Sequence, residues 1–460
     1  MPAKLLFCVL LILPLYSKCY CSDTLKVPLK WTETYFKKPS TTNTPYLYSA
    51  GIKDSDELYK EVKFPENFPN LKLALFHFQY SQYLYYKYMS GILSRKDYDS
   101  TLADLTAWPD TADVVNRFIR EYVIVGFQNQ GGKILAFIDF NNNNDLSDET
   151  PIPFYQFPAA GVKSRKSNKP AVYKFTYDYY DGRKICNRTV SACIKFDVRH
   201  LFRYPGSGGL MLDSPKHIVY EGETWVKGKA YNFSILGGLN VQIRRYAKLA
   251  IKEKQKKIVP LDYSYIPGDT IFLNDEYYKF AAVTYAMDTL FLTKLSGNLK
   301  PTGPYPGLFA PELKAETVEG KPFSLKALKG KYVVLHLHNT FCKAAREENN
   351  KTFSKVYEKY RNENAVFVSV ASDDSLEKVK AHWKGFDAEW LKAYKYPGPF
   401  GKTIKHAEFF NSFIGASGSF YLIDPSGKVV SKIYFYGPET LMEACDKAFG
   451  KKITLNQILK

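Results

Sequence analysis

The sequence lacks several features that would place it in a simple class. After residue 15, none of its 460 residues form an apolar run long enough to cross a bilayer. We find no internal repeat, and the histidines, seven in all, lack the spacing of transition-metal ligands. These absences exclude a membrane-spanning domain downstream of residue 15, a repeat protein and a histidine-based metal site.

Positive charge is plentiful, but it is not gathered into one patch. The net charge is +18, yet the lysines are scattered apart from a run at residues 252–257, which we interpret as a solvated face. We therefore expect no nucleic-acid partner. The 36 tyrosines and 32 phenylalanines are unusually many, and because aromatic residues favour strands they predict a β-rich protein.

The first 21 residues have the pattern of a secretory signal peptide. Lys4 precedes a short apolar run over residues 5–15, and small residues follow at a candidate cleavage site. We expect export across the inner membrane to the periplasm or cell envelope, with no transmembrane segment after cleavage. Neither Cys19 nor Cys21 has the usual lipoprotein context, but a lipid anchor, and with it membrane association, stays open as an alternative.

Composition and turn signals divide the rest of the chain. Short aromatic runs alternating with turns predict strands, whereas residues 110–127 look helical. Beyond a segment rich in proline and glycine, strands alternate with helices, which predicts an α/β domain. The predicted regions are a mixed α/β region (22–125), a β-rich, sandwich-like or barrel-like domain (126–297), a linker (298–306), the α/β domain (307–450) and a tail (451–460).

The α/β region resembles a known family. "YVVLHLHNTFC" is a buried strand that leads to Cys342, and "CKAAREE" parallels a Cys-x-x-Cys-Arg-x-Glu motif. "FVSVASDD" and "GSFYLIDPSGKVV" parallel the following strand and the terminal hairpin. In this order the pieces resemble the TlpA/redoxin-type (AhpC/TSA-like) thioredoxin-fold domains of envelope thiol-disulfide oxidoreductases. The larger layout resembles secreted proteins of Bacteroidetes-type bacteria. The resemblance implies a multidomain chain with a C-terminal α/β thioredoxin-like fold.

The resemblance also implies the site residues. Cys342 stands where the family places its nucleophile, at a helix start, where the N–H groups and Lys343 would lower the thiol pKa. The motif is also matched by Arg346 and Glu348. The resolving cysteine, the cis-proline that faces the cysteines and a preceding tryptophan are replaced by Ala345, Gly418 and Phe341.

Two histidines precede the motif on the predicted strand. His336 and His338 alternate around Leu337, so we expect both side chains on one face. His336 occupies a position where the family keeps a polar buried residue near the cysteine. It is a candidate for tuning the thiol; the alternative is a core histidine satisfied by a backbone carbonyl.

These residues support two hypotheses of function. In the first, the protein is a secreted thiol-disulfide oxidoreductase relative in which Cys342 acts alone. Its partners would be envelope protein thiols or disulfides, or an external thiol reductant, and no cofactor is required. In the second, a non-catalytic binding or structural envelope protein retains only the thioredoxin fold. A peroxidase is disfavoured because Asn339 stands where that chemistry requires Thr or Ser.

Three further cysteines lie outside the motif. Cys186 and Cys193 fall in the strand-like stretch "KICNRTVSACIKF", and an exported protein can form disulfides, so a staple between them is a candidate. Cys445 lies in the predicted terminal helix, where it is typical of a buried apolar residue. A resolving role for Cys445 is the alternative.

Residues 139–149, "DFNNNNDLSDE", carry alternating oxygen ligands. The pattern matches positions 1, 3, 5 and 7 of an EF-hand-like loop, and Asn144 tolerates the left-handed conformation needed at position 6. Position 12 is Thr150, and no helix pair is expected beside the loop. We expect either a structural calcium site or an Asn-rich turn closed by its own hydrogen bonds. The candidate ligands are Asp139, Asn141, Asn143, Asp145, Asp148 and Glu149.

Overall fold

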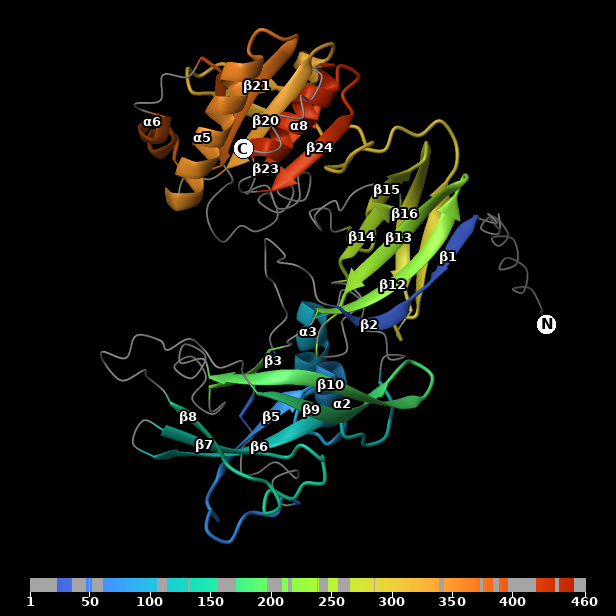
Figure 1. The fold of residues 1–460 in the computed structure, drawn as a ribbon, viewed down its shortest axis with the longest axis vertical. Coiled ribbons are helices and arrows are strands. Elements are labelled where there is room, and N and C mark those ends of the chain that lie inside the picture. Colours follow the sequence, from blue (N-terminus) through green and yellow to red (C-terminus); the bar gives the residue numbers. More distant parts are fainter. Residues whose placement is uncertain are drawn as a thin grey trace, which may run out of the picture.

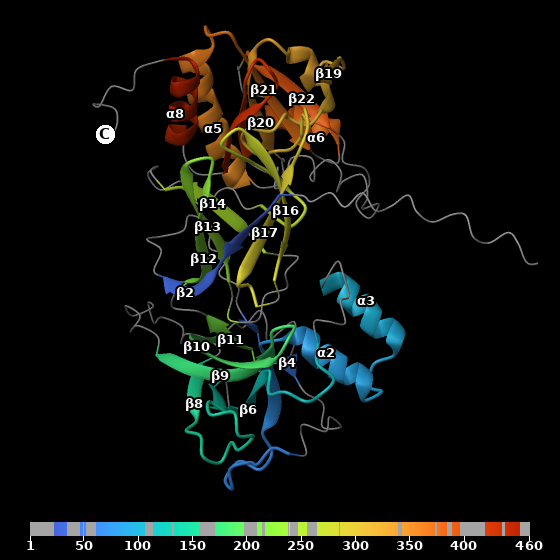
Figure 2. The same ribbon diagram turned by 90° about the vertical axis from the view of Figure 1, so that its right-hand side faces the viewer.

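The chain forms three bodies stacked along its longest axis (Figures 1 and 2). The computed structural model describes residues 23–34, 47–48, 50–51, 61–105, 114–130, 133–155, 171–196, 209–213, 217–237, 239, 247–254, 265–284, 286–338, 343–372, 375–383, 389–395, 419–434 and 438–450. Within these ranges no helix is both long enough and apolar enough to cross a membrane.

The N-terminal two-sheet unit contains a five-stranded and a four-stranded sheet. The first has the order β4-β5-β6-β7-β8, with bounds Ala50–Gly51, Lys72–His77, Tyr122–Gln130, Lys133–Ile138 and Ile152–Tyr155. The second has the order β3-β11-β10-β9, with bounds Leu47–Tyr48, Leu210–Asp213, Ile185–Phe196 and Val172–Tyr180. Side chains of both sheets, such as Phe76, Val125 and Phe175, share one core. Helices α2 (Tyr80–Met89) and α3 (Arg95–Leu105) lie to one side (Figure 2).

The central two-sheet unit pairs two four-stranded sheets around a second core. One has the order β1-β17-β16-β15, with bounds Thr24–Pro28, Thr289–Leu295, Glu276–Val283 and Thr270–Leu273. The other has the order β14-β13-β12-β2, with bounds Leu249–Glu253, Lys229–Leu236, His217–Val226 and Lys30–Thr34. Alternate residues of β13 are buried, as expected for a strand with one face in a core. Phe233, Phe280 and Leu290 are fully buried there.

The C-terminal domain is built on a mixed seven-stranded sheet. The order is β19-β18-β22-β21-β20-β23-β24, with bounds Pro322–Ser324, Lys314–Thr317, Leu391–Lys395, Ala365–Ser372, Tyr332–His338, Ser419–Ile423 and Val429–Tyr434. β20, β21 and β22 are parallel, and β20 is buried along nearly its whole length, as central parallel strands are. One face packs against α5 (Lys343–Tyr360), α6 (Leu376–Trp383) and α8 (Pro438–Ala448). The other face packs against Leu313 and the 3-10 helix η4 (Leu325–Leu328).

The structure confirms strands separated by turns after residue 265 and corrects the predicted helix. Strands β15, β16 and β17 are antiparallel, and the turn residues Asn274, Asp275 and Met287 have positive φ. The helix predicted over 110–127 is wrong in its described part, because Tyr122–Gln130 is β6. The first six residues of β6 are all buried, which suits a central strand between two cores and not a half-exposed helix.

The two-sheet units do not follow the predicted sequence boundaries. The predicted boundary at residue 125 falls inside β6. β1 and β2 lie in the segment assigned to the mixed α/β region, yet they pair with β17 and β12 of the central unit. The segment predicted as a linker is packed as well, since Tyr305 is buried in the central core. The chain therefore enters the central unit, leaves it for the N-terminal unit and then returns.

Candidate functional site

The candidate thiol site lies between the end of β20 and the start of α5. β20 ends at His338 and α5 begins at Lys343, so the residue before the helix in the sequence is Cys342. Phe341, Cys342 and Gly418 lie outside the described residues. The side chains at the start of α5 also lie outside the described part of the chain; they are those of Lys343, Ala345, Arg346 and Glu348. The structure describes the strand before the site, the helix after it and the side chains packed beneath.

His336 and His338 lie on one face of β20, as predicted. Both are buried, and their rings are stacked with centroids 4.7 Å apart. On the same side, the ring of Phe353 from α5 lies 5.3 Å from His336, and Trp383 from α6 meets His338 edge-on at 5.2 Å. The two imidazoles therefore belong to the layer between the sheet and the helices that flank the site.

His336 also contacts the neighbouring strand. The register of the parallel pair places His336 beside Ser369, and its Nδ1 lies 2.9 Å from the Ser369 hydroxyl, within hydrogen-bonding distance. At Nδ1 the partner is a side-chain hydroxyl, whereas the sequence suggested a backbone carbonyl as the partner of this histidine. Sequence reasoning missed Ser369, although a hydroxyl between two valines in the buried run "FVSVA" was a signal. The contact holds the imidazole in one orientation.

Cys445 is a core residue of α8. It is fully buried, and burial, reinforced by the neighbouring Asp446 carboxylate, raises the pKa of its thiol to about 12. Asp446 itself accepts hydrogen bonds from the Tyr360 hydroxyl at 2.7 Å and from Lys359 at 3.0 Å. Since the thiolate is the nucleophile, Cys445 is unsuited to thiol exchange near neutral pH.

The predicted disulfide between Cys186 and Cys193 is wrong. The structure forms no disulfide between them, and both lie on the single strand β10. A strand rises about 3.3 Å per residue, so residues seven apart are separated by roughly 23 Å, against about 4–7 Å between the Cα atoms of a disulfide. The odd spacing also points the two side chains to opposite faces. The Cys186 thiol instead donates to Asp181 at 3.3 Å.

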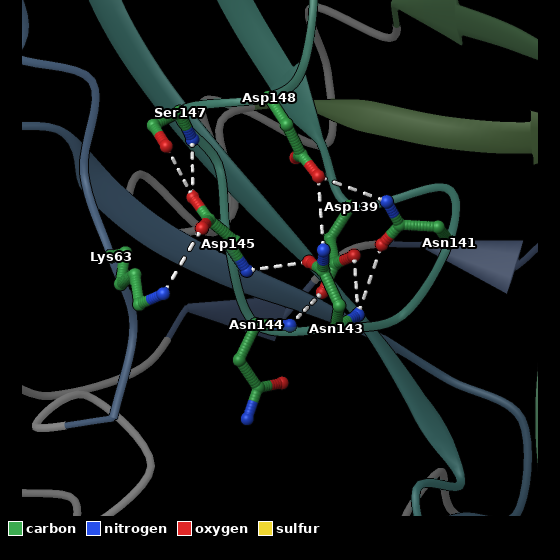
Figure 3. A network of polar contacts seen from close by, with 8 residues as sticks. All are labelled: Lys63, Asp139, Asn141, Asn143, Asn144, Asp145, Ser147 and Asp148. Atoms are coloured by element: carbon green, nitrogen blue, oxygen red, sulfur yellow. Dashed lines mark hydrogen bonds and ion pairs between the residues drawn. The ribbon is translucent and has the colours of Figure 1, made fainter.

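The Asn-rich loop is organised around a buried carboxylate (Figure 3). Asp139, the residue after β7, is fully buried and accepts the backbone N–H groups of Asn143 at 2.9 Å and Asn144 at 2.8 Å. Burial raises the pKa of this carboxyl, although these hydrogen bonds oppose the shift. Asn144 has φ +63°, the left-handed conformation expected at this position, and Asn142 has φ +57°.

The exposed side of the loop is closed by its own side chains (Figure 3). Asp148 accepts the amide groups of Asn141 at 3.1 Å and Asn143 at 2.9 Å. Asp145 forms an ion pair with Lys63 at 3.3 Å, in a neighbouring segment of the N-terminal unit. The candidate ligands are thus brought together, and donors from the loop and from Lys63 occupy several of their oxygen atoms.

Glu149 completes the loop by reaching back to its beginning. Its carboxylate accepts the backbone N–H of Phe140 at 2.8 Å. Among the described residues, no group of three or more His, Cys, Asp or Glu side chains is arranged to hold a metal ion. The hydrogen bonds match the self-closed turn, and calcium binding stays a prediction.

Comparison with known proteins places the C-terminal domain in a family context. The sequence profile of the AhpC/TSA family matches residues 306–432. The thiol-disulfide oxidoreductase ResA of Bacillus cereus is 32% identical over 127 residues, which are 28% of this chain and 68% of that protein. ResA of Bacillus anthracis is 29% identical over 150 residues, 32% of this chain and 78% of that protein.

A solved structure that matches is the thioredoxin domain of a thiol-disulfide oxidoreductase from Bacteroides vulgatus. It is 22% identical, with a TM-score of 0.27, and the match covers 32% of this chain and 98% of that domain. A thioredoxin-family thiol:disulfide interchange protein from Chlorobium tepidum is 24% identical, also with a TM-score of 0.27, over 34% of this chain and 100% of that one.

Proposed function

Because the chain belongs to the AhpC/TSA family through its C-terminal domain, we propose that it is a thiol-disulfide oxidoreductase-type protein with a single nucleophile, Cys342. The relatives named thiol-disulfide oxidoreductase support thiol chemistry at this domain. The observation that carries the single-thiol proposal is Ala345, which stands one helical turn after Cys342 and offers no resolving thiol.

The other cysteines of the described part of the chain are poor substitutes for a resolving thiol. Cys445 is buried on the core side of α8, and its raised pKa keeps it protonated. Cys186 and Cys193 lie on β10 of the N-terminal unit, a different body from the one that carries the site. Burial also raises the pKa of both thiols. These features support a site that depends on a thiol from another molecule.

The proposed reaction is a two-step exchange. The Cys342 thiolate attacks one sulfur of a substrate disulfide, forming a mixed disulfide and releasing the other sulfur as a thiolate. An external thiol then attacks the mixed disulfide, frees Cys342 and takes its place in a new disulfide. After these two steps, a second external thiol attacks the new disulfide, so that the second substrate sulfur leaves as a thiolate and the two external thiols end as a disulfide. In total, two electrons pass from the external thiols to the substrate, and Cys342 ends the cycle reduced.

His336 is the positioning residue of this proposal. It is fully buried on the strand that leads to Cys342, and Ser369 holds its ring. We assign it the tuning of the thiol through the layer beneath the site. In His336→Asn, the midpoint of the pH dependence of Cys342 alkylation should shift. If His336 had a purely structural role, the substitution would lower stability and leave that midpoint unchanged.

The proposed location is the periplasm or cell envelope. The support is the N-terminal pattern of Lys4 followed by the apolar run of residues 5–15. Expression of the full chain in a Gram-negative host, followed by fractionation and mass determination of the mature N-terminus, tests the location. A protein recovered in the cytoplasm with residues 1–21 intact would contradict it.

The second candidate function is non-catalytic binding by a thioredoxin-like domain. Ala345 and Gly418, which replace two residues of the family's motif, favour it. Insulin reduction with excess external thiol separates the two functions. We expect activity in the wild type and in Cys445→Ser, and none in Cys342→Ser. Ala345→Cys should lower the concentration of external thiol required. Equal rates in the wild type and Cys342→Ser would contradict catalysis by Cys342 and favour the non-catalytic binding function.

A further inference from the structure

The central unit and the C-terminal domain are joined by backbone hydrogen bonds along the edge of a sheet. Gly307 N–H donates to Val429 O, and Val429 N–H donates to Leu308 O, each at 2.8 Å. Ala310 N–H donates to Gly427 O, also at 2.8 Å. The segment after the central unit therefore runs antiparallel to the start of β24 and extends the seven-stranded sheet at that edge.

Side chains continue this contact into the core of the central unit. Leu308 and Tyr305 are buried in that core. The Tyr305 ring packs on Tyr265 with centroids 4.3 Å apart, and its hydroxyl donates to Asp269 at 2.9 Å. The junction is thus a packed interface that β24 shares.

A lysine of the C-terminal domain is buried at this interface. Lys432, in the middle of β24, is only 1% exposed. Its ammonium nitrogen lies 5.1 Å from the ring centre of Tyr305 and 5.6 Å from that of Tyr421, its neighbour on β23. Ring faces attract a cation at these distances, and burial withdraws the amine from bulk water, which disfavours its charged form.

The charges around Lys432 come from both bodies. Asp269 of the central unit attracts it, while burial lowers the pKa of Lys432 to about 7. Burial raises the pKa of Asp269, and the positive charge of Lys279 on β16 opposes that rise. Among the described residues, the titratable groups near the amine are therefore Asp269, Tyr305 and Tyr421, and Lys279 acts on Asp269.

We propose that Lys432 makes the contact between the central two-sheet unit and the C-terminal domain sensitive to pH. With a neutral amine, the two bodies are docked through β24. Protonation places an ammonium group in a site with little water, and the contact loosens. The orientation of the thiol-bearing domain relative to the rest of the chain then depends on the pH of its surroundings.

The sign of the effect follows from proton binding. When the bodies separate, Lys432 regains water and a pKa of about 10.4, so between pH 7 and that value the separated form binds more protons. Raising the pH over this window therefore favours the docked form. The equilibrium constant for docking rises by up to roughly tenfold per pH unit. Below pH 7 both forms are protonated and the dependence ends.

Limited proteolysis of the full-length protein tests this. A non-specific protease is applied at pH 7 and pH 9.5, and cleavage between residues 298 and 310 is measured, normalised to an unfolded peptide substrate. We expect the wild-type rate to fall at least tenfold at the higher pH. The Lys432→Met variant should be cleaved slowly at both pH values. Lys326→Met, which removes the same charge from an exposed position on η4 of the C-terminal domain, should behave as the wild type.

Parallel pH profiles in the wild type and Lys432→Met would overturn the proposal, because a purely structural lysine changes the rate equally at every pH. If Lys432→Met does not fold, Asp269→Asn provides the test. Without the carboxylate the pKa of Lys432 falls further, so the onset of the pH dependence should move to lower pH. An onset that stays in place or rises would contradict the proposal.

Discussion

Gly307 is the backbone position on which the junction between the central unit and the C-terminal domain depends. Its φ is +85°, and a Cβ added there would lie 2.2 Å from the ring of Phe272. A left-handed conformation costs an L-residue about 1–2 kcal/mol, and overpacking adds about 1–3 kcal/mol. Gly307→Ala should therefore lower the free energy of unfolding by about 2–5 kcal/mol in total.

Gly320→Ala is the matched control for this substitution. Gly320 has the same φ of +85°, but the nearest atom to its added Cβ is the flexible Glu316 carboxylate at 3.8 Å. Gly320→Ala should therefore lower the free energy of unfolding only by the cost of the left-handed conformation, about 1–2 kcal/mol. Both variants are measured by guanidinium denaturation, followed by circular dichroism and tryptophan fluorescence. Equal losses in the two variants would refute the close approach of Gly307 to Phe272.

Three further predictions concern the buried thiol and the Asn-rich loop. Cys445 should resist thiol reagents at pH 8 in the native protein and react after denaturation; native labelling, read by peptide mass spectrometry, would contradict its burial. Asp139→Asn should lower the free energy of unfolding by about 1–3 kcal/mol, whereas the exposed Asn141→Ala should change it little; equal losses in chemical denaturation would contradict the organising role of Asp139. The calcium hypothesis predicts that calcium raises the melting temperature of chelator-treated protein, less so in Asp148→Asn; an unchanged melting temperature argues against it.

The sequence predicted best where local patterns decide the structure. The buried run of β20 and the apolar spacing of α5, with Phe353, Val356 and Tyr360 on the core side, identify a strand and a helix without knowledge of their partners. The family motif then placed Cys342 between them. The turn between β15 and β16 is also of a kind that local residues decide, because Asn274 and Asp275 both tolerate positive φ.

Predictions failed where the structure depends on distant parts of the chain. Pairing of β2 with β12 joins residues 30–34 to residues 217–221, and nothing local identifies that partner. The Cys186–Cys193 disulfide failed because spacing alone does not show whether the chain turns between two cysteines, and β10 continues through both. The burial of Lys432 was also hidden, since a lysine in a strand is ordinarily a solvent-facing residue.

The central claim is that Cys342 acts as the single reactive thiol of this domain. Its direct test is the rate of Cys342 alkylation as a function of pH, resolved by peptide mass spectrometry, together with trapping of the mixed disulfide. We expect the thiol to titrate below the ordinary value of about 8.5 and a Cys342 adduct that external thiol releases. Titration at or above that value, with no adduct, would contradict the claim.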